Sequence, residues 1–109
     1  MVEATAIAYI AGIVDGEGYI GIKKKRAHGR IAYTAHIQVR MVDEAAIRFM
    51  SSTLGGRYYP ETKRGKRTLY CYSASDRRAA TIIAAIRPYM LVKAVNADTI
   101  LAFRQLVEE

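Results

Sequence analysis

One stretch of the sequence decides the fold: Ile10-Ala11-Gly12-Ile13-Val14-Asp15-Gly16-Glu17-Gly18, in which an apolar helical pattern ends among acids and glycines. Apolar residues lead into it at helical spacing, so we predict a helix over residues 3–15. Gly16 and Gly18 are expected to end that helix. Ala8, Gly12 and Gly16 recur every four residues, and such a stripe would let a second helix approach closely. Ordinary packing within the chain's own core would use the same small residues.

Outward from this helix the hydrophobic period changes to two, which predicts strands over residues 19–25 and 30–41. His28-Gly29 between them is a turn signal, so the two runs form a hairpin. In the second run one face is apolar and consists of Ile31, Tyr33, Ala35, Ile37 and Val39. The opposite face consists of Arg30, Ala32, Thr34, His36, Gln38 and Arg40.

The next segments repeat the pattern. Asp43 can cap a helix that runs to about Leu54, where Gly55-Gly56 ends it. A second hairpin is predicted over residues 57–61 and 66–73, with its turn at Lys63-Arg64-Gly65. Pro60 indicates an edge strand or a bulge. In its second strand we expect Leu69 and Cys71 to face opposite to Thr68, Tyr70 and Tyr72.

Two further helices complete the chain. Ser73 or Ser75 can begin the first, which Arg87-Pro88 should end, and the second is predicted over residues 92–107. The order is typical of an α+β fold, αββαββα, with one four-stranded antiparallel sheet and its helices on one face. The opposite face would form an open saddle. At 109 residues, we expect a single domain over residues 1–109.

Composition narrows the function classes. Hydrophobic residues make up 51% and charged residues 25% of the chain, which favours a folded protein over a disordered one. No apolar run could span a bilayer and no secretion signal is apparent, so we expect no membrane contact and an intracellular protein, cytoplasmic or organellar, not secreted. The single cysteine, Cys71, allows no intrachain disulfide, and two histidines give no zinc pattern, so any metal should have oxygen ligands.

The chain carries a formal charge of +7, which indicates a polyanionic partner such as nucleic acid. Solubility or anionic lipid could also explain it. The open face sharpens the prediction because it gathers side chains suited to duplex DNA, with basic turns for phosphates. A merely solvated face and an RNA partner remain open alternatives. The predicted DNA contacts are Lys23, Lys25, Arg30, Thr34, His36, Gln38, Arg40, Arg57, Tyr59, Lys63, Arg64, Lys66, Arg67, Thr68, Tyr70 and Tyr72.

Residues 10–18 closely resemble the signature of the LAGLIDADG homing endonucleases. Ala11, Gly12, Asp15 and Gly18 coincide with that signature, and Glu17 takes its catalytic acidic position. The expected element order also resembles the family's core over nearly the whole chain. The resemblance implies site-specific double-strand DNA cleavage, of the kind encoded within introns or inteins, by metal-dependent phosphodiester hydrolysis.

The chemistry can also be argued from the residues. Asp15 and Glu17 flank a helix C-terminus, whose negative dipole end disfavours carboxylates unless a cation compensates. Mg²⁺ prefers carboxylate and carbonyl oxygens, so Glu17 and the Gly16 carbonyl are the expected metal ligands, and Mn²⁺ is expected to substitute. An inert capping role for Glu17 is the alternative. The resemblance gives Asp15 a structural role and Lys93 an electrostatic one in catalysis.

One copy of the signature implies a homodimer with two or more divalent ions, whose signature helices pair across a twofold axis. Its expected interface consists of Ala8, Ala11, Gly12, Asp15 and Gly16, and its target would be long and pseudo-palindromic. Gln38 is a third catalytic candidate, although Met41 takes a position that is polar in the family. The alternatives are a non-cleaving nucleic-acid-binding protein of the same fold, an intron maturase or a transcriptional regulator, and an unrelated basic interaction domain.

Overall fold

The computed structural model describes residues 2–108, and its order of elements is the predicted one. Nine elements follow one another along the chain: α1 (Ala4–Glu17), β1 (Gly18–Ala27), β2 (Arg30–Met41), α2 (Glu44–Leu54), β3 (Arg57–Glu61), β4 (Leu69–Ser75), α3 (Asp76–Ile86), the 3-10 turn η1 (Arg87–Tyr89) and α4 (Ala94–Glu108). None of the helices in this part of the chain is long and apolar enough to cross a membrane.

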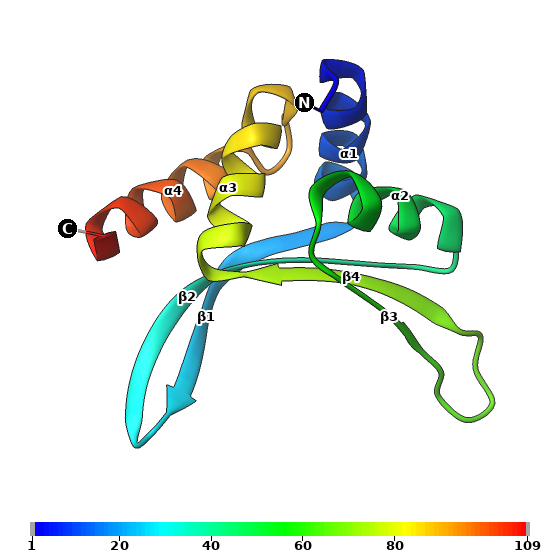
Figure 1. The fold of residues 1–109 in the computed structure, drawn as a ribbon, viewed down its shortest axis with the longest axis horizontal. Helices are drawn as coiled ribbons and strands as arrows, with labels where there is room; N and C mark the ends of the chain where they lie inside the picture. Colours follow the sequence, from blue (N-terminus) through cyan, green and yellow to red (C-terminus); the bar gives the residue numbers. More distant parts are fainter. Residues whose placement is uncertain (1, 109) are drawn as a thin grey trace.

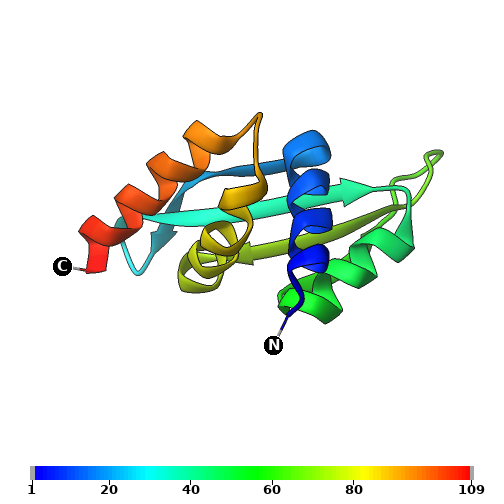
Figure 2. The ribbon, with the colours of Figure 1, turned by 90° about the horizontal axis from the view of Figure 1, so that it is seen from above.

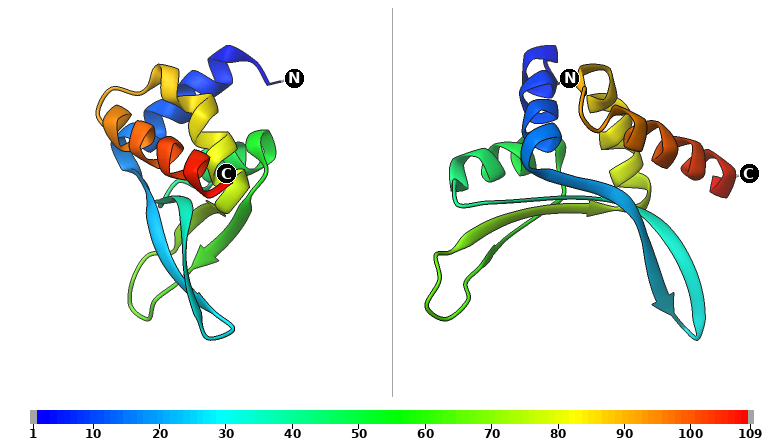
Figure 3. Two further views of the ribbon diagram at one scale, coloured as in Figure 1. Left: turned by 90° about the vertical axis from the view of Figure 1, so that its left-hand side faces the viewer. Right: turned by 180° about the vertical axis from the view of Figure 1, so that it is seen from behind.

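The four strands form one antiparallel sheet in the order β1-β2-β4-β3. All helices lie on one side of it (Figure 1), and the view from above shows them laid across the strands (Figure 2). The sheet arches, and both hairpins bend away from the helices, so the uncovered face is concave (Figure 3). The predicted α+β architecture with one open sheet face is confirmed.

The core lies between the helices and the middle of the sheet. On β2, Ala35, Ile37 and Val39 are fully buried or nearly so, as the period-two pattern predicts. Ile10 and Val14 of α1 pack against them and are also fully buried. Burying side chains of this size contributes roughly 1.5–3 kcal/mol each, so the apolar stripe of α1 anchors that helix to the sheet.

The β1–β2 hairpin continues beyond the helices. Ile31 and Tyr33 share the apolar face of β2 but are 52% and 56% exposed, because no helix covers this end of the sheet (Figure 1). The hairpin turns at His28 and Gly29, which both have positive φ, 53° and 75°. A two-residue turn of this kind matches the twist of the strands and fixes their register.

The predicted faces of β4 are wrong. Tyr72 pairs with Val39 and Tyr70 with Met41, so both tyrosines lie on the helix side, and neither is a DNA contact of the open face. Tyr72 is fully buried, and its hydroxyl donates to the Gly55 carbonyl at 2.7 Å. A polar hydroxyl with an acceptor in reach lets a tyrosine fill a core position, and burial raises the pKa of Tyr72 to about 12.

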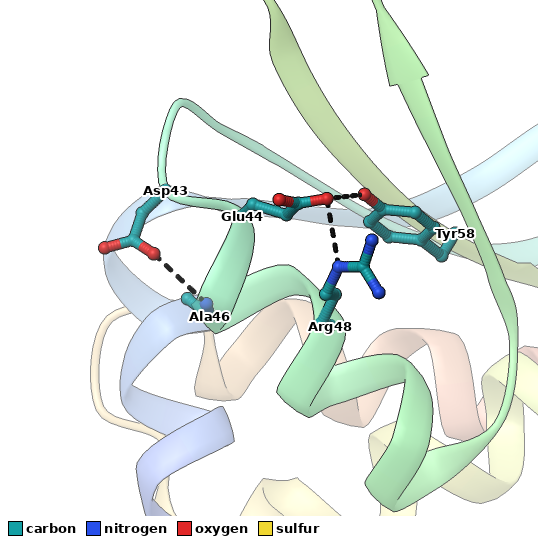
Figure 4. Close-up of polar contacts among 5 residues, drawn as sticks. All are labelled: Asp43, Glu44, Ala46, Arg48 and Tyr58. Carbon is teal, nitrogen blue, oxygen red and sulfur yellow. Dashed lines mark hydrogen bonds and ion pairs between the residues drawn. The ribbon is translucent and has the colours of Figure 1, made fainter.

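Other local predictions are confirmed or adjusted. Asp43 caps α2 by accepting from the Ala46 amide at 3.3 Å, and its neighbour Glu44 holds Arg48 at 2.9 Å and the Tyr58 hydroxyl (Figure 4). β3, which contains Pro60, is an edge strand. Residues 66–68 precede β4 and are not part of it, so Thr68 lies in the turn region, where its hydroxyl meets that of Thr62 at 2.8 Å.

Candidate functional site

Glu17 is the last residue of α1, two residues further along than the predicted end of the helix. The chain passes directly from it into β1 because Gly18 has no side chain. A Cβ at Gly18 would lie 2.9 Å from the backbone of Val14, too close for any other residue. The Glu17 side chain is exposed and makes no hydrogen bond or ion pair with any residue that the structure describes.

The structure brings Glu17 and Gln38 together. They line one shallow pocket of about 300 Å³, together with Gly18, Tyr19 and Arg40, at the junction of α1 with the open sheet face. Met41 points to the helix side of β2, where it packs on the core. The polar side chains beside Glu17 are therefore those of Gln38 and Arg40. We call the pocket formed by Glu17, Tyr19, Gln38 and Arg40 the α1-end pocket.

Asp15 lies two residues from Glu17 but has a different environment. Its carboxylate accepts hydrogen bonds from three consecutive backbone amides, those of Leu91, Val92 and Lys93, at 2.8, 2.9 and 2.8 Å. The bond from Val92 is the largest cause that lowers the pKa of Asp15, ahead of those from Leu91 and Lys93, while burial opposes them. Asp15 thus fixes the turn that leads into α4, and its carboxylate is occupied within its own chain.

The position of Lys93 removes one reason to expect a metal ion at the end of α1. Its ammonium donates to the backbone carbonyl of Asp15 at 2.6 Å, so a cation of this chain already lies at the negative end of α1. The helix dipole alone therefore gives no reason for a divalent ion. Lys93 does not line the α1-end pocket, so its predicted role in catalysis stays a prediction.

A metal site is incomplete in one chain. Within residues 2–108, no group of three or more His, Cys, Asp and Glu side chains lies together in a way that could hold a metal ion. Glu17 offers one carboxylate, and the backbone carbonyls beside it, including that of Gly16, are further oxygen donors. A hard cation would need additional oxygen ligands from another molecule, such as a second copy or a phosphate.

The exposed side of α1 carries two glycines. Gly12 and Gly16 are exposed, and a Cβ built on either residue would meet nothing within 4 Å. Neither glycine is needed for packing inside the subunit, so ordinary intrachain packing does not account for them. Ala8 is half-buried beside them. Ala11 is fully buried in its own core, so its predicted place in a dimer interface is wrong.

The open face of the sheet is concave and basic. A depression of about 690 Å³ lies over β2, β3 and β4, and a second one of about 620 Å³ follows the β1–β2 hairpin. Lys23, His36, Gln38, Arg40, Arg57 and Tyr59 line the first; Lys23, Lys25 and Thr34 line the second, and the register places Arg30 on the same face. Lys63, Arg64, Lys66 and Arg67 are exposed in the β3–β4 turn.

Sequence reasoning missed several residues of this face, among them Tyr19 and Arg78. Tyr19 pairs with Gln38, and its ring lies across Gly21, where a Cβ would be 2.1 Å from the tyrosine hydroxyl. The alternation that starts at Tyr19 could have revealed it. Arg78 reaches the main depression from α3, and its guanidinium lies so close to Gly55 that a Cβ there would be 2.3 Å from it. No pattern in the sequence places a helix residue on the open face.

The fold of this chain is that of the LAGLIDADG homing endonucleases, as predicted from residues 10–18. The homing endonuclease I-CvuI in complex with its target in the presence of Ca superposes with a TM-score of 0.78 and 18% identity, covering 93% of this chain and 66% of that one. The archaeal intron-encoded I-Vdi141I, complexed with DNA, gives 0.74 and 17%, covering 95% and 70%.

The LAGLIDADG homing endonuclease I-GzeII, in complex with a DNA target, gives a TM-score of 0.72 and 13% identity, covering 94% of this chain and 36% of that one. The present chain thus spans about two thirds of I-CvuI and about one third of I-GzeII. No family model matches the sequence, and no curated protein sequence matches it.

Proposed function

We propose that two copies of this chain form a site-specific double-strand DNA endonuclease, with Glu17 of each copy at the cleavage site. One observation carries the proposal: Glu17 has no partner in its own described chain and lies between the two surfaces that such an enzyme needs. On one side are the exposed glycines Gly12 and Gly16. On the other side is the basic concave face.

The stripe supports pairing of the two α1 helices. Helices approach closely only where the residues between them are small, and nothing of the described chain fills the space over Gly12 and Gly16. Pairing there would bring the two Glu17 carboxylates near one another and complete a ligand set that one chain lacks within residues 2–108. The twofold axis would be mirrored in a long, pseudo-palindromic target.

The concave face supports binding of duplex DNA. Its lysines and arginines can neutralise phosphates, and amide and guanidinium groups such as Gln38 and Arg57 can reach base edges. The solved structures of I-CvuI, I-Vdi141I and I-GzeII are complexes with DNA, which agrees with this use of the fold. The exposed β3–β4 turn would add phosphate contacts.

The proposed ion is Mg²⁺, with Mn²⁺ as a substitute and two or more ions per dimer. When bound, it supplies charge stabilisation at the phosphate and a more acidic water. Glu17 and the Gly16 carbonyl would hold it. Gln38 and Arg40, across the α1-end pocket, would orient the phosphate and the attacking water, and the Asp15–Lys93 contact would keep the end of α1 in place.

A non-cleaving nucleic-acid-binding protein is the second candidate. Two observations favour it: Met41 faces the core where the family has a polar residue, and Lys93 is engaged with a backbone carbonyl. An intron maturase or a transcriptional regulator of this fold would use the same concave face without cutting. The retained carboxylate at Glu17 favours the enzyme.

Selection of cleaved sites from a randomised duplex library with Mg²⁺ separates these functions. We expect wild type to yield one enriched pseudo-palindromic site, and Glu17→Gln to bind that site without cutting it. The matched control is Glu3→Gln, which removes an exposed glutamate at the other end of α1 and should cut as wild type does. Binding without cutting by wild type would support the regulator or maturase, and cutting by Glu17→Gln would remove Glu17 from the site.

A further inference from the structure

His36 is a buried histidine on the open face of the sheet. It is 8% exposed and is the one buried polar or charged residue among those that the structure describes. Its Nδ1 atom lies 2.9 Å from the Ser75 hydroxyl, and the Tyr19 ring lies 6.4 Å away, centre to centre. Its Nε2 atom is buried, and the group beside it that can form a hydrogen bond is the side-chain amide of Gln38. A buried ring nitrogen of this kind normally has a partner.

Gln38 connects His36 to the α1-end pocket. His36, Gln38 and Arg40 are alternate residues of β2, so their side chains follow one another along the open face. The Gln38 amide has its oxygen toward Arg40, because the opposite placement would set its nitrogen against guanidinium donors. In this placement the oxygen accepts from Arg40 Nε at 2.9 Å and from Nη2 at 3.3 Å. Arg40 Nη2 also contacts Glu61 at 3.3 Å.

The Gln38 amide cannot keep its hydrogen bonds to both His36 and Arg40 in both protonation states of His36. Neutral His36 can donate from Nδ1 to Ser75 and accept at Nε2 from the Gln38 amide nitrogen, which leaves the amide oxygen for Arg40. Protonated His36 has a proton on both nitrogens and needs an acceptor at Nε2. The Gln38 oxygen can supply it only if the amide turns over, which breaks both bonds to Arg40.

We propose that His36 is a positioning residue whose protonation turns the Gln38 amide and thereby releases the Arg40 guanidinium within the α1-end pocket. Release means that the guanidinium loses its two bonds to Gln38 and keeps only the exposed contact with Glu61. A freed arginine beside Glu17 is then available to a phosphate oxygen. This last step rests on the proposed function, whereas the turn of the amide does not.

The surroundings favour the neutral form of His36 in the free protein. Burial of the ring is the main cause that lowers the pKa of His36, followed by the charge of Lys23 on β1. A hydrogen bond to the Gln38 oxygen would oppose this, and it is lost when that oxygen turns to Arg40. The two depressions of the open face are lined by the cations Lys23, Lys24, Lys25, Arg40, Arg57, Arg78 and Arg104. Among residues 2–108 the one acid that lines them is Asp76, which pairs with Arg104 at 3.0 Å.

A bound polyanion would reverse this balance. Phosphates laid over the cations would offset their charge and favour protonated His36, so binding of a duplex should take up a proton. By linkage, lowering the pH should tighten binding by up to about tenfold per pH unit while His36 titrates. Arg40 would thus be released when a duplex lies on the sheet.

NMR of the full chain tests the turn of the amide without DNA or cleavage. The side-chain signals of the Gln38 amide and of Arg40 Nε should titrate with the same midpoint as the His36 ring, and both titrations should vanish in His36→Gln. In Gln38→Met the His36 ring should still titrate while Arg40 Nε stays constant. His28→Gln, which removes the exposed histidine of the β1–β2 turn, is the control and should change neither signal. Signals of Gln38 and Arg40 that ignore the His36 titration would overturn the proposal.

A second measurement isolates the step that needs DNA. The affinity for a mixed-sequence duplex is measured at constant ionic strength from about pH 5 to pH 8, the range in which histidines titrate. Tightening at low pH in wild type and in His28→Gln, and its loss in His36→Gln, would support release toward phosphate. A pH-independent affinity would overturn that step. Absence of duplex binding at every pH would contradict the proposed function, and the NMR titration would still decide whether the amide turns.

Discussion

The inner and outer sides of the α1 end hold two acids in opposite situations. On the inner side, Asp15 accepts three backbone hydrogen bonds and is fixed to the start of α4. On the outer side, Glu17 is exposed at the α1-end pocket and has no partner in the described chain. Two carboxylates separated by one glycine thus differ in what surrounds them, and only the unsatisfied one has spare capacity for a ligand.

The difference shows why acidic pairs in a sequence need a structure before roles are assigned. The carboxylate of Asp15 is fully engaged, so its loss should be felt in folding. Glu17 makes no hydrogen bond or ion pair within the described chain, so its loss should be felt in chemistry. Substitutions at the two acids and at Gly12 test this division of roles.

Glu17→Gln should give the largest effect. We expect the cleavage rate to fall by roughly a thousandfold, since metal stabilisation at a phosphate contributes several kcal/mol. The free energy of unfolding should change by less than about 0.5 kcal/mol, because the side chain is exposed and makes no hydrogen bond or ion pair in the described chain. Single-turnover cleavage and urea unfolding measure the two quantities. A large loss of stability would mean that Glu17 has a structural contact that the free chain does not show.

Asp15→Asn should behave in the opposite manner. It removes the charge and one acceptor oxygen from three backbone amides, and we expect the free energy of unfolding to fall by about 2 kcal/mol. Urea denaturation measures this loss. Asp43→Asn is the control, because that cap accepts a single amide hydrogen bond at 3.3 Å and asparagine caps equally well. Equal stability of Asp15→Asn and wild type would contradict the structural role of Asp15.

Gly12→Ala should separate folding from pairing. Within one subunit the added methyl meets open space, and replacing a helical glycine should raise the free energy of unfolding by about 0.5–1 kcal/mol. In the proposed pair of α1 helices the same methyl should weaken dimerisation roughly tenfold, as overpacking commonly costs about 1–3 kcal/mol. Analytical ultracentrifugation and urea unfolding of dilute protein check both. Ser52→Ala, on the exposed side of α2, is the control that should leave dimerisation unchanged, and an unweakened Gly12→Ala dimer would move the interface away from α1.

The pH dependence of stability should give the smallest effect. Because its hydrogen bonds hold the pKa of Asp15 below 3.8 in the folded chain, Asp15 stabilises the fold above that pH. As the pH falls below 3.8 toward the folded-state pKa, the unfolded chain takes up the proton first and the stabilisation is lost. The difference in unfolding free energy between wild type and Asp15→Asn should therefore shrink below pH 3.8. A difference that stays constant down to about pH 2 would show that the charge is irrelevant.

Much of the fold could be predicted because each segment has its own period. The helical spacing before Gly18, the alternation on β2 and the turn at His28-Gly29 each depend on neighbours in sequence, and all are confirmed. The prediction for β4 is wrong because Leu69, Cys71, Tyr70 and Tyr72 alternate without a clear polar side. Its face is set by pairing with β2 and by the Gly55 carbonyl that accepts from Tyr72, both distant in sequence.

Part of the candidate site could likewise be predicted from the sequence and part could not. A local signature identifies Glu17, and the alternation of β2 identifies Gln38. The contact of Lys93 with Asp15 cannot be found from the sequence, because it joins residues 78 positions apart and depends on how α4 lies against α1. Arg78 escapes sequence reasoning for the same reason. Local sequence patterns predict motifs and which face of a strand a side chain lies on. The partners of charged side chains depend on tertiary packing.

The Asp15–Lys93 contact also has a consequence for synthesis of the protein. The end of α1 leaves the ribosome before its anchors do, because the amides and the ammonium that fix it are made 76 to 78 residues later. At translation rates of about 5–20 residues per second this delay is roughly 4–16 seconds. During that interval the nascent chain has the signature helix without its anchor. The region around Glu17 can therefore take its final position only after residues 91–93 have been made.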